Sequence, residues 1–191
     1  MIKKFFMKSW IGGKQVEIEL PEEVGCTYED LFQKHRGCYR EDSVLQAACL
    51  YAAFRIHHQP RTLQEMGDLM GIPVHYIGHA FKRMKLKLPQ QKPEEYIDRY
   101  LEKLGHDPVV REEISARAKH IIESARHCKD FCCVCNKVPS HVASGAIYIS
   151  SILQGDRRTQ RVISEVCHTS SVVVNKHYKE LAEKGDLEII L

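Results

Sequence analysis

Residues 45–54 (LQAACLYAAF) and residues 142–151 (VASGAIYISS) are two versions of one segment, displaced by 97 positions. Each segment is apolar or small on nearly every side of a helix, which is typical of a helix buried at the centre of a bundle. The small residues allow neighbouring helices to approach closely. A repeat at this long spacing predicts two similar domains and argues against a short-period solenoid.

The displacement holds without a gap beyond these segments. It relates residues 61–62 (RT) to 158–159 (RT), and residues 80–84 (AFKRM) to 177–181 (HYKEL). Chance does not explain residues that match at one constant displacement across some 35 residues. The chain therefore contains a duplicated unit.

Each unit is predicted to be a series of helices. Thr62 and Thr159 suit the N-caps of corresponding helices, and the two prolines of residues 89–93 (PQQKP) bar a helix between the units. In the first unit we expect helices at 27–35, 42–57, 62–70 and 73–86, with the opening helix missing. In the second we expect them at about 93–104, 108–127, 139–153, 159–167 and 170–184.

The N-terminal stretch predicts a β-hairpin. Val16, Ile18 and Leu20 alternate with polar residues, as in a half-buried strand, and residues 12–13 (GG) separate this stretch from residues 5–11. A lone hairpin is marginal in water, so this one must pack on the helices or on a partner. The expected domains are a hairpin extension at 1–23, a shortened first repeat at 24–88 and a second repeat at 89–191.

Composition and length exclude several classes of protein. The 191 residues suffice to bury one or two helical cores without disulfides. No run of roughly 18 apolar residues occurs, and Lys8 interrupts the first apolar stretch too early for a signal peptide. The histidines have no nucleophile or paired carboxylate at suggestive spacing, and no phosphate-binding glycine loop occurs. We therefore expect an intracellular protein that contacts no membrane and is not an enzyme.

Charge is distributed unevenly. The net charge is only +3, yet no Asp or Glu lies between Leu69 and Pro93. This interval contains a basic strip formed by Lys82, Arg83, Lys85 and Lys87. The strip is either a solvated helix end and linker or a surface for phosphates or an acidic partner.

Four of the eight cysteines are clustered: Cys128, Cys132, Cys133 and Cys135. Thiolates at such spacing can hold zinc, although the pattern is not a pair of Cys-x-x-Cys motifs. Unligated thiols are the other interpretation, and disulfides are the poorer one in a chain without an export signal. Cys49 and Cys167 fall in helical patterns as small apolar fillers. No cofactor is expected elsewhere.

Residues 159–181 have the proportions of a helix-turn-helix, whose second helix can enter a DNA major groove. The residues there and in the first unit resemble transcription factor IIB of archaea and eukaryotes. The stretches similar to its second repeat are 146–151 (AIYISS), 155–166 (GDRRTQRVISEV), 172–175 (VVVN) and 178–181 (YKEL). Those similar to its first repeat are 48–53 (ACLYAA), 60–63 (PRTL) and 77–82 (IGHAFK).

The resemblance implies an all-α fold of two tandem cyclin-like repeats without catalysis. In the family, the repeats hold promoter DNA and the TATA-binding protein, and the second repeat's helix-turn-helix reads an upstream element in the major groove. Carried over by position, Val172 and Asn175 would contact bases, which requires them to face solvent. The other interpretation of Val172 is that it faces the helical core. The positions implied along phosphates are Arg157, Arg158, Thr159 and Gln160, with Lys137 near a DNA-facing turn. Lys176 and Lys179 either contact phosphates or form a solvated face.

Two departures from the family pattern stand out. Asn175 replaces an arginine, and asparagine matches adenine where arginine matches guanine. No paired Cys-x-x-Cys zinc ribbon precedes the first repeat, which puts recruitment of RNA polymerase in doubt. The chain is then either part of a longer factor or a paralogue that regulates initiation by competition. The location would be cytoplasmic in an archaeon and nuclear in a eukaryote.

A cyclin-type protein–protein adaptor remains the alternative, since cyclins share this helical architecture and fold does not settle function. The basic residues favour DNA, and a steep salt dependence of binding would distinguish the two.

Overall fold

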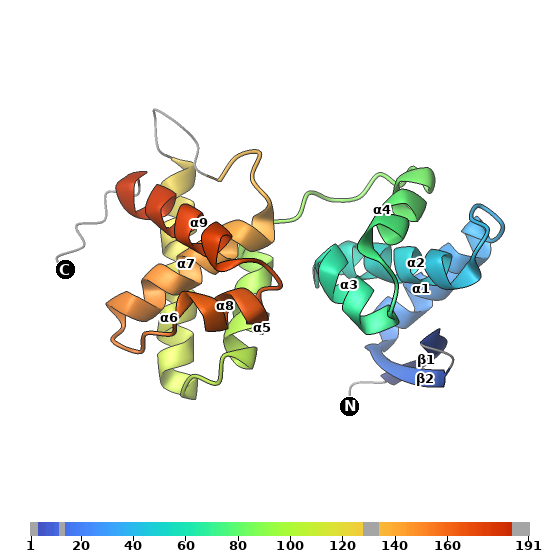
Figure 1. Cartoon of the computed structure of the whole chain (residues 1–191), viewed down its shortest axis with the longest axis horizontal. Helices are drawn as coiled ribbons and strands as arrows, with labels where there is room; N and C mark the ends of the chain where they lie inside the picture. The colour runs from blue at the N-terminus through green and yellow to red at the C-terminus, as the bar shows by residue number, and fades with distance from the viewer. Residues whose placement is uncertain (1–3, 12–13, 128–133, 185–191) are drawn as a thin grey trace. The chain divides into compact units, whose positions relative to one another are not determined.

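A computed structural model describes residues 4–11, 14–127 and 134–184, and the chain divides into two compact units, residues 1–91 and 92–191. Each unit has its own buried core. Residues 84–93 connect α4 of the first unit to α5 of the second (Figure 1).

The first unit opens with the predicted hairpin. Strand β1 (Lys4–Ile11) pairs antiparallel with β2 (Lys14–Pro21). Ile18 and Leu20 are buried, whereas the glutamates between and before them are exposed, which confirms the alternation seen in the sequence. The expected turn at residues 12–13 lies outside the described residues.

The hairpin packs on the first helix, as a two-stranded sheet in water requires. The ring of Phe5 lies directly on Gly25 of that helix: a Cβ added to Gly25 would come within 2.1 Å of the ring. Only glycine permits this contact. The hairpin is therefore part of the first unit's core.

Four helices follow in the first unit: α1 (Glu22–His35), α2 (Asp42–Ile56), α3 (Leu63–Met70) and α4 (Val74–Arg83). The expected start of α1 at Thr27 is wrong by five residues. Glu22 and Glu23 begin the helix because acidic side chains are favourable in a first turn, although they add nothing to its apolar periodicity. Helix α4 ends three residues before its predicted end.

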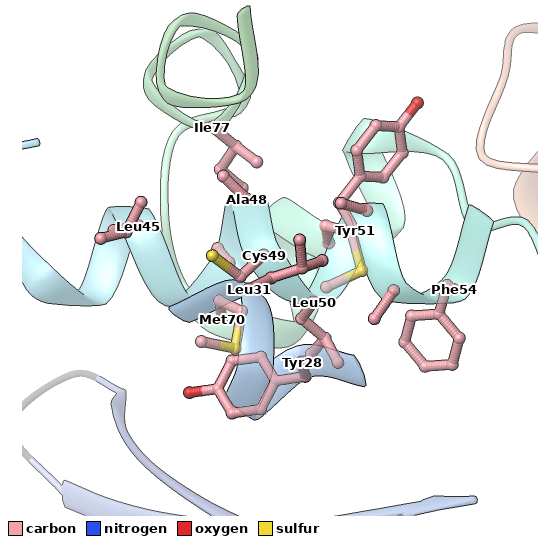
Figure 2. Packing of buried hydrophobic residues seen from close by; sticks show 14 of the residues in the cluster. Tyr28, Leu31, Leu45, Ala48, Cys49, Leu50, Tyr51, Phe54, Met70 and Ile77 are labelled. Atoms are coloured by element: carbon pink, nitrogen blue, oxygen red, sulfur yellow. The ribbon is translucent and has the colours of Figure 1, made fainter. Parts of the chain in front are cut away.

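Helix α2 forms the centre of the first unit, as its all-round apolar pattern predicts. Figure 2 shows Tyr28 and Leu31 of α1 on one side of α2 and Ile77 of α4 on the other. Leu45, Leu50 and Ile77 are completely buried. The small residues of α2 permit this close packing on both sides.

Five helices form the described part of the second unit: α5 (Glu94–Lys103), α6 (Pro108–Arg126), α7 (Pro139–Leu153), α8 (Gln160–Val166) and α9 (Ser171–Lys184). Every boundary lies within one residue of its prediction. Helix α7 packs against each of the other four, as α2 does at the centre of the first unit.

Helices α1 to α4 correspond in order to α6 to α9. The first unit thus has no counterpart of α5 among its described residues, and the hairpin precedes α1 in its place. The structure confirms an all-α fold of two cyclin-like repeats with a small N-terminal hairpin. None of the described helices is both long and apolar enough to cross a membrane.

Candidate nucleic-acid interface

Helices α8 and α9 meet at a short turn, which we call the α8–α9 corner (residues 159–184). Thr159 caps α8, because its hydroxyl accepts a hydrogen bond from the amide of Val162 at 3.3 Å. His168 adopts a left-handed conformation with φ of 50°, and the amide of Thr169 donates to the carbonyl of Ser164 at 3.0 Å. These bonds reverse the chain between the two helices.

Hydroxyl groups fix the start of α9 against α8. The hydroxyl of Ser164 donates to the carbonyl of Arg161 at 2.8 Å and lies 3.2 Å from the hydroxyl of Ser171. The hydroxyl of Ser170 accepts from the amide of Val173 at 3.3 Å, which caps the first turn of α9. The N-terminal part of α9 is therefore held in one orientation relative to α8.

One face of α9 is buried against the core. Val174 and Leu181 are almost completely buried, and His177 is 6% exposed. At Gly145 of α7, an added Cβ would lie 2.9 Å from the backbone carbon of His177. Helices α7 and α9 thus cross at a distance that only glycine permits at this point.

The opposite face of α9 is open to solvent. Val172 is 76% exposed, which is unusual for an aliphatic side chain on a well-packed helix. Lys176 and Lys179 are exposed, and Asn175 is half-buried. Val172, Asn175, Lys176 and Lys179 therefore line one accessible stripe, as base and phosphate contacts would require.

The segment before α8 is held by a network that sequence reasoning missed. His106 Nδ1, whose side chain is completely buried, lies 2.6 Å from Asp156 Oδ2. Arg158 approaches the same oxygen at 3.6 Å and donates to the carbonyl of Gly105 at 3.4 Å. The hydrogen bond from His106 lowers the pKa of Asp156, with Arg158 adding to the effect. This network anchors the entry to α8 on the turn before α6.

The four residues expected along phosphates differ in solvent exposure and in the contacts that they already make within the chain. Arg157 is exposed and donates to the Tyr148 hydroxyl at 3.4 Å, whereas Arg158 takes part in the network described above. Thr159 is exposed with its hydroxyl used as a cap, and Gln160 is half-buried. Of the two arginines, Arg157 is the more accessible to a ligand.

Lys137, which precedes α7, lies against the C-terminal half of α9. Its ammonium group is 3.5 Å from Glu180, in the C-terminal half of the helix, and both side chains are about three-quarters buried. The Nδ1 atom of His177 is 3.4 Å from the other carboxylate oxygen of Glu180. Lys137 thus belongs to a cluster of ion pairs with Glu180 and His177, whereas Val172 and Asn175 lie in the N-terminal half of α9.

That cluster includes two histidines. The rings of His141 and His177 are 5.9 Å apart. Burial lowers the pKa of His141. Burial also lowers the pKa of His177, against an opposing effect of Glu180 and with the help of His141, Lys137 and Lys176.

In the first unit, the residues of the basic strip (Lys82, Arg83, Lys85 and Lys87) are all exposed. The Arg83 guanidinium lies over the ring of Tyr39, 5.8 Å from its centroid. The strip begins at the end of α4 and continues into the segment that follows it. It is accessible, as an ionic partner would require.

Of the clustered cysteines, Cys128, Cys132 and Cys133 lie outside the described residues. Cys135 is exposed and disulfide-bonded, so for this residue the expectation that disulfides are the poorer interpretation is wrong. A disulfide sulfur is not the thiolate that a metal requires. In the part of the chain that the structure describes, no three His, Cys, Asp or Glu side chains come together as a metal site. Zinc at the cluster stays a prediction. Cys49 and Cys167 are completely buried, as their helical positions predict.

The fold and this surface define a class of protein: two cyclin-like repeats, the second of which exposes one stripe of a helix at a tight corner. The model of the transcription factor TFIIB repeat matches residues 17–87 and 86–184. Transcription initiation factor IIB of Methanosphaerula palustris is 36% identical over 174 residues, covering 89% of this chain and 50% of that protein. Transcription initiation factor IIB 1 of Thermococcus kodakarensis is 32% identical, covering 88% of this chain and 56% of that protein.

This chain therefore belongs to the transcription factor IIB family, as its repeated motifs indicate. The matched relatives are transcription initiation factors and not enzymes, which agrees with the prediction that the chain is not an enzyme. The chain spans about half the length of the curated relatives that it matches. Among solved structures, a chain of a CAK complex from Chaetomium thermophilum matches with a TM-score of 0.35 and 13% identity, over 87% of this chain and 55% of that one.

Proposed function

We propose that this chain acts in transcription initiation by binding promoter DNA together with the TATA-binding protein, with the α8–α9 corner as a helix-turn-helix that enters the major groove. The single observation that carries the proposal is the 76% exposure of Val172 at the start of a helix whose other face is buried. An exposed, rigidly held N-terminal turn is what a recognition helix presents to base edges.

The accessible stripe has the chemistry for this role. The Val172 side chain can contact the methyl group of thymine, and the amide of Asn175 can bond the N6 and N7 atoms of adenine. Lys176 and Lys179 follow on the same stripe and can pair with phosphates, which sets the register without reading sequence. The basic strip of the first unit supplies a second ionic surface, for the TATA-binding protein or the DNA backbone.

A gel-shift assay with the TATA-binding protein and promoter duplex tests the proposal. Native chain is expected to give a supershifted complex that weakens steeply as salt rises. Val172→Glu places a carboxylate against the groove and is expected to weaken the complex about tenfold or more, since unpaired like charge at an interface costs more than a lost contact.

Gln33→Glu is the control, because it adds the same negative charge at an exposed position of α1, which belongs to the other compact unit. It is expected to bind like the native chain. Equal loss in both variants, or a native chain that forms no complex at any salt concentration, contradicts the proposal and favours a protein–protein adaptor.

Asn175→Arg tests base reading separately. Arginine grips O6 and N7 of guanine, so a binding-site selection is expected to shift from adenine to guanine at one position, by about 1–3 kcal/mol of discrimination. A variant with unchanged sequence preference would show that Asn175 does not face a base.

A further inference from the structure

The polar part of His106 is committed to a single bond. Its side chain is completely buried between α5 and α6, and its Nδ1 lies 2.6 Å from Asp156 Oδ2, 50 positions away. An ionised carboxylate can only accept a hydrogen bond, so Nδ1 donates. The other ring nitrogen, Nε2, is buried and makes no hydrogen bond to the described residues. Because an unsatisfied buried nitrogen is costly, the bond to Asp156 is what this imidazole contributes as a polar group.

The Asp156 carboxylate is held between His106 and Arg158. The Arg158 guanidinium lies 3.6 Å from Asp156 Oδ2, the same oxygen that accepts from His106, and it donates to the carbonyl of Gly105 at 3.4 Å. The turn at Gly105 and His106 therefore contacts both members of the ion pair. The charge of Arg158 is paired within the chain, and the carboxylate of Asp156 is fixed in position.

Arg157 stands between these two residues and is directed differently. Exposure alternates along the segment, since Asp156 and Arg158 are half-buried whereas Arg157 is exposed. The bond that Arg157 donates to the Tyr148 hydroxyl is long, at 3.4 Å, and its partner is neutral. This bond therefore does not compensate the charge of Arg157, which can pair with an external anion.

We propose that His106 is a positioning residue for DNA binding: by fixing the Asp156 carboxylate beside Arg158, it leaves Arg157 as the arginine of this segment that contacts a phosphate. The proposal rests on the DNA contact proposed for the α8–α9 corner and assigns different roles to two adjacent arginines. Released from His106, the Asp156 carboxylate can pair with Arg157 or face the DNA backbone and repel it. Either change removes the phosphate contact without altering the base-reading residues of α9.

The salt dependence of promoter binding reports the number of phosphate contacts and tests this assignment. The full chain is titrated onto promoter duplex with the TATA-binding protein at several salt concentrations. Arg157→Gln is expected to lower the salt slope by about one unit and to raise Kd about fivefold, because one phosphate contact is lost. Arg158→Gln is expected to lower the melting temperature of the chain and to leave the slope unchanged.

Lys34→Gln is the matched control, because it removes a positive charge at an exposed position of α1, which belongs to the other compact unit. It is expected to bind like the native chain. A one-unit loss of slope in Arg158→Gln with none in Arg157→Gln would overturn the assignment.

Two substitutions at His106 separate positioning from folding. Asparagine keeps an amide that can donate to Asp156, whereas leucine fills a similar space without a donor. Both variants are expected to lower the melting temperature. His106→Leu is expected to reproduce the loss of slope and the rise in Kd of Arg157→Gln, and His106→Asn is expected to bind like the native chain. Equal binding by the two variants, whether native-like or weakened, contradicts a positioning role.

Combined substitutions test whether His106 acts through Arg157. Adding His106→Leu to Arg157→Gln is expected to cause no further loss, since the contact is already absent, and additive losses would contradict the proposal. Adding Asp156→Asn to His106→Leu is expected to restore part of the affinity, because the released charge is gone. Circular dichroism establishes that the helices of each variant are intact.

Val172→Glu is measured in the same assay to keep the two proposals distinguishable. Binding that is lost in Val172→Glu and retained in His106→Leu contradicts the role of His106 alone. Binding that is weakened in His106→Leu and retained in Val172→Glu supports the role of His106 and contradicts base recognition by α9. A native chain that forms no complex contradicts both proposals.

Discussion

The α3–α4 corner of the first repeat and the α8–α9 corner of the second join equivalent helices by different chemistry. In the first, Gly67 faces Val74, and a Cβ on Gly67 would lie 2.9 Å from the carbonyl oxygen of Ile72. In the second, the corresponding residues are Ser164 and Ser171, whose hydroxyls are 3.2 Å apart. The corner of the first repeat is therefore held by a close apolar contact, and the equivalent corner of the second repeat by a hydrogen bond.

At the centres of the repeats, the glycine lies in the second repeat and not in the first. Ala48 of α2 corresponds to Gly145 of α7, and Ala80 of α4 corresponds to His177 of α9. The first repeat has alanine at both positions, whereas in the second the missing Cβ of Gly145 leaves room for the backbone of His177 and Tyr178. The difference teaches that equivalent helix pairs can be built from different residues, with glycine required where an added Cβ would meet the backbone of the partner helix.

The largest effect is expected from adding a side chain to Gly145, where α9 approaches α7 most closely. Gly145→Val places side-chain atoms on the backbone of His177 and Tyr178, which cannot retreat, and is expected to destabilise the second repeat by about 3 kcal/mol or more. Ala48→Gly, the reciprocal change, is expected to cost only about 1 kcal/mol, from backbone entropy and one lost methyl group. Urea unfolding followed by circular dichroism measures both.

If Gly145→Val were as stable as the native chain, α7 and α9 would not cross this closely. Hydrogen exchange of the two variants locates the weakened repeat. Protection is expected to fall in residues 92–184 for Gly145→Val and in residues 14–91 for Ala48→Gly.

The helix caps give the next largest difference. Thr62 and Glu65 form a complete capping box, with the two bonds at 3.0 and 2.8 Å. Thr159 makes a single bond, because Val162 stands where the first repeat has Glu65. We expect Thr62→Ala to cost about 1–2 kcal/mol and Thr159→Ala about 0.5–1 kcal/mol.

Thermal unfolding of the two alanine variants checks this order. Val162→Glu sharpens the test: by completing the box in the second repeat, it is expected to raise the cost of Thr159→Ala toward that of Thr62→Ala. Identical costs in the native background would show that the glutamate contributes nothing.

A smaller effect depends on pH. His141 and His177 stand where the first repeat has Val44 and Ala80. Burial lowers the pKa of both histidines below the ordinary value of a histidine side chain, so the unfolded chain binds protons more readily than the folded chain. By linkage, the second repeat is expected to lose stability as pH falls below about 6.5, the unfolded histidine value.

The matched variant is His141→Val/His177→Ala, which installs the pair found in the first repeat. Its melting temperature is expected to depend less on pH between neutrality and pH 5 than that of the native chain, measured by calorimetry. Glu180, Lys137 and Lys176 face this pair and stay in place, so an unchanged profile would show that the two histidines do not cause the dependence.

The repeat itself shows what sequence could predict. The 97-residue register and the apolar pattern placed every helix of the second repeat within one residue, because both depend on local spacing. The start of α1 was missed because Glu22 and Glu23 stabilise a helix end through charge, which leaves no apolar periodicity. The expectation that Val172 faces solvent followed from the resemblance to the family's recognition helix, because the apolar pattern alone equally allowed it to face the core.

Contacts between residues that are distant in the sequence could not be predicted from local spacing. The bond from His106 to Asp156 spans 50 positions, and the pair of Lys137 with Glu180 spans 43. Each depends on how two helix ends approach in three dimensions, and neither residue type favours one partner over the many others in the chain.

The smallest predicted effect concerns the left-handed residue of each corner. Gly71 has φ of 64° in the first repeat, and its counterpart His168 has φ of 50°. A non-glycine residue in this conformation is strained, so His168→Gly is expected to stabilise the second repeat by about 0.5–1 kcal/mol, and Gly71→Ala to destabilise the first by about 1 kcal/mol. Denaturant midpoints of the two variants should therefore move in opposite directions. Movement in the same direction would mean that the side chain of His168 makes contacts that outweigh its backbone strain, and that the two corners differ in more than their turn residue.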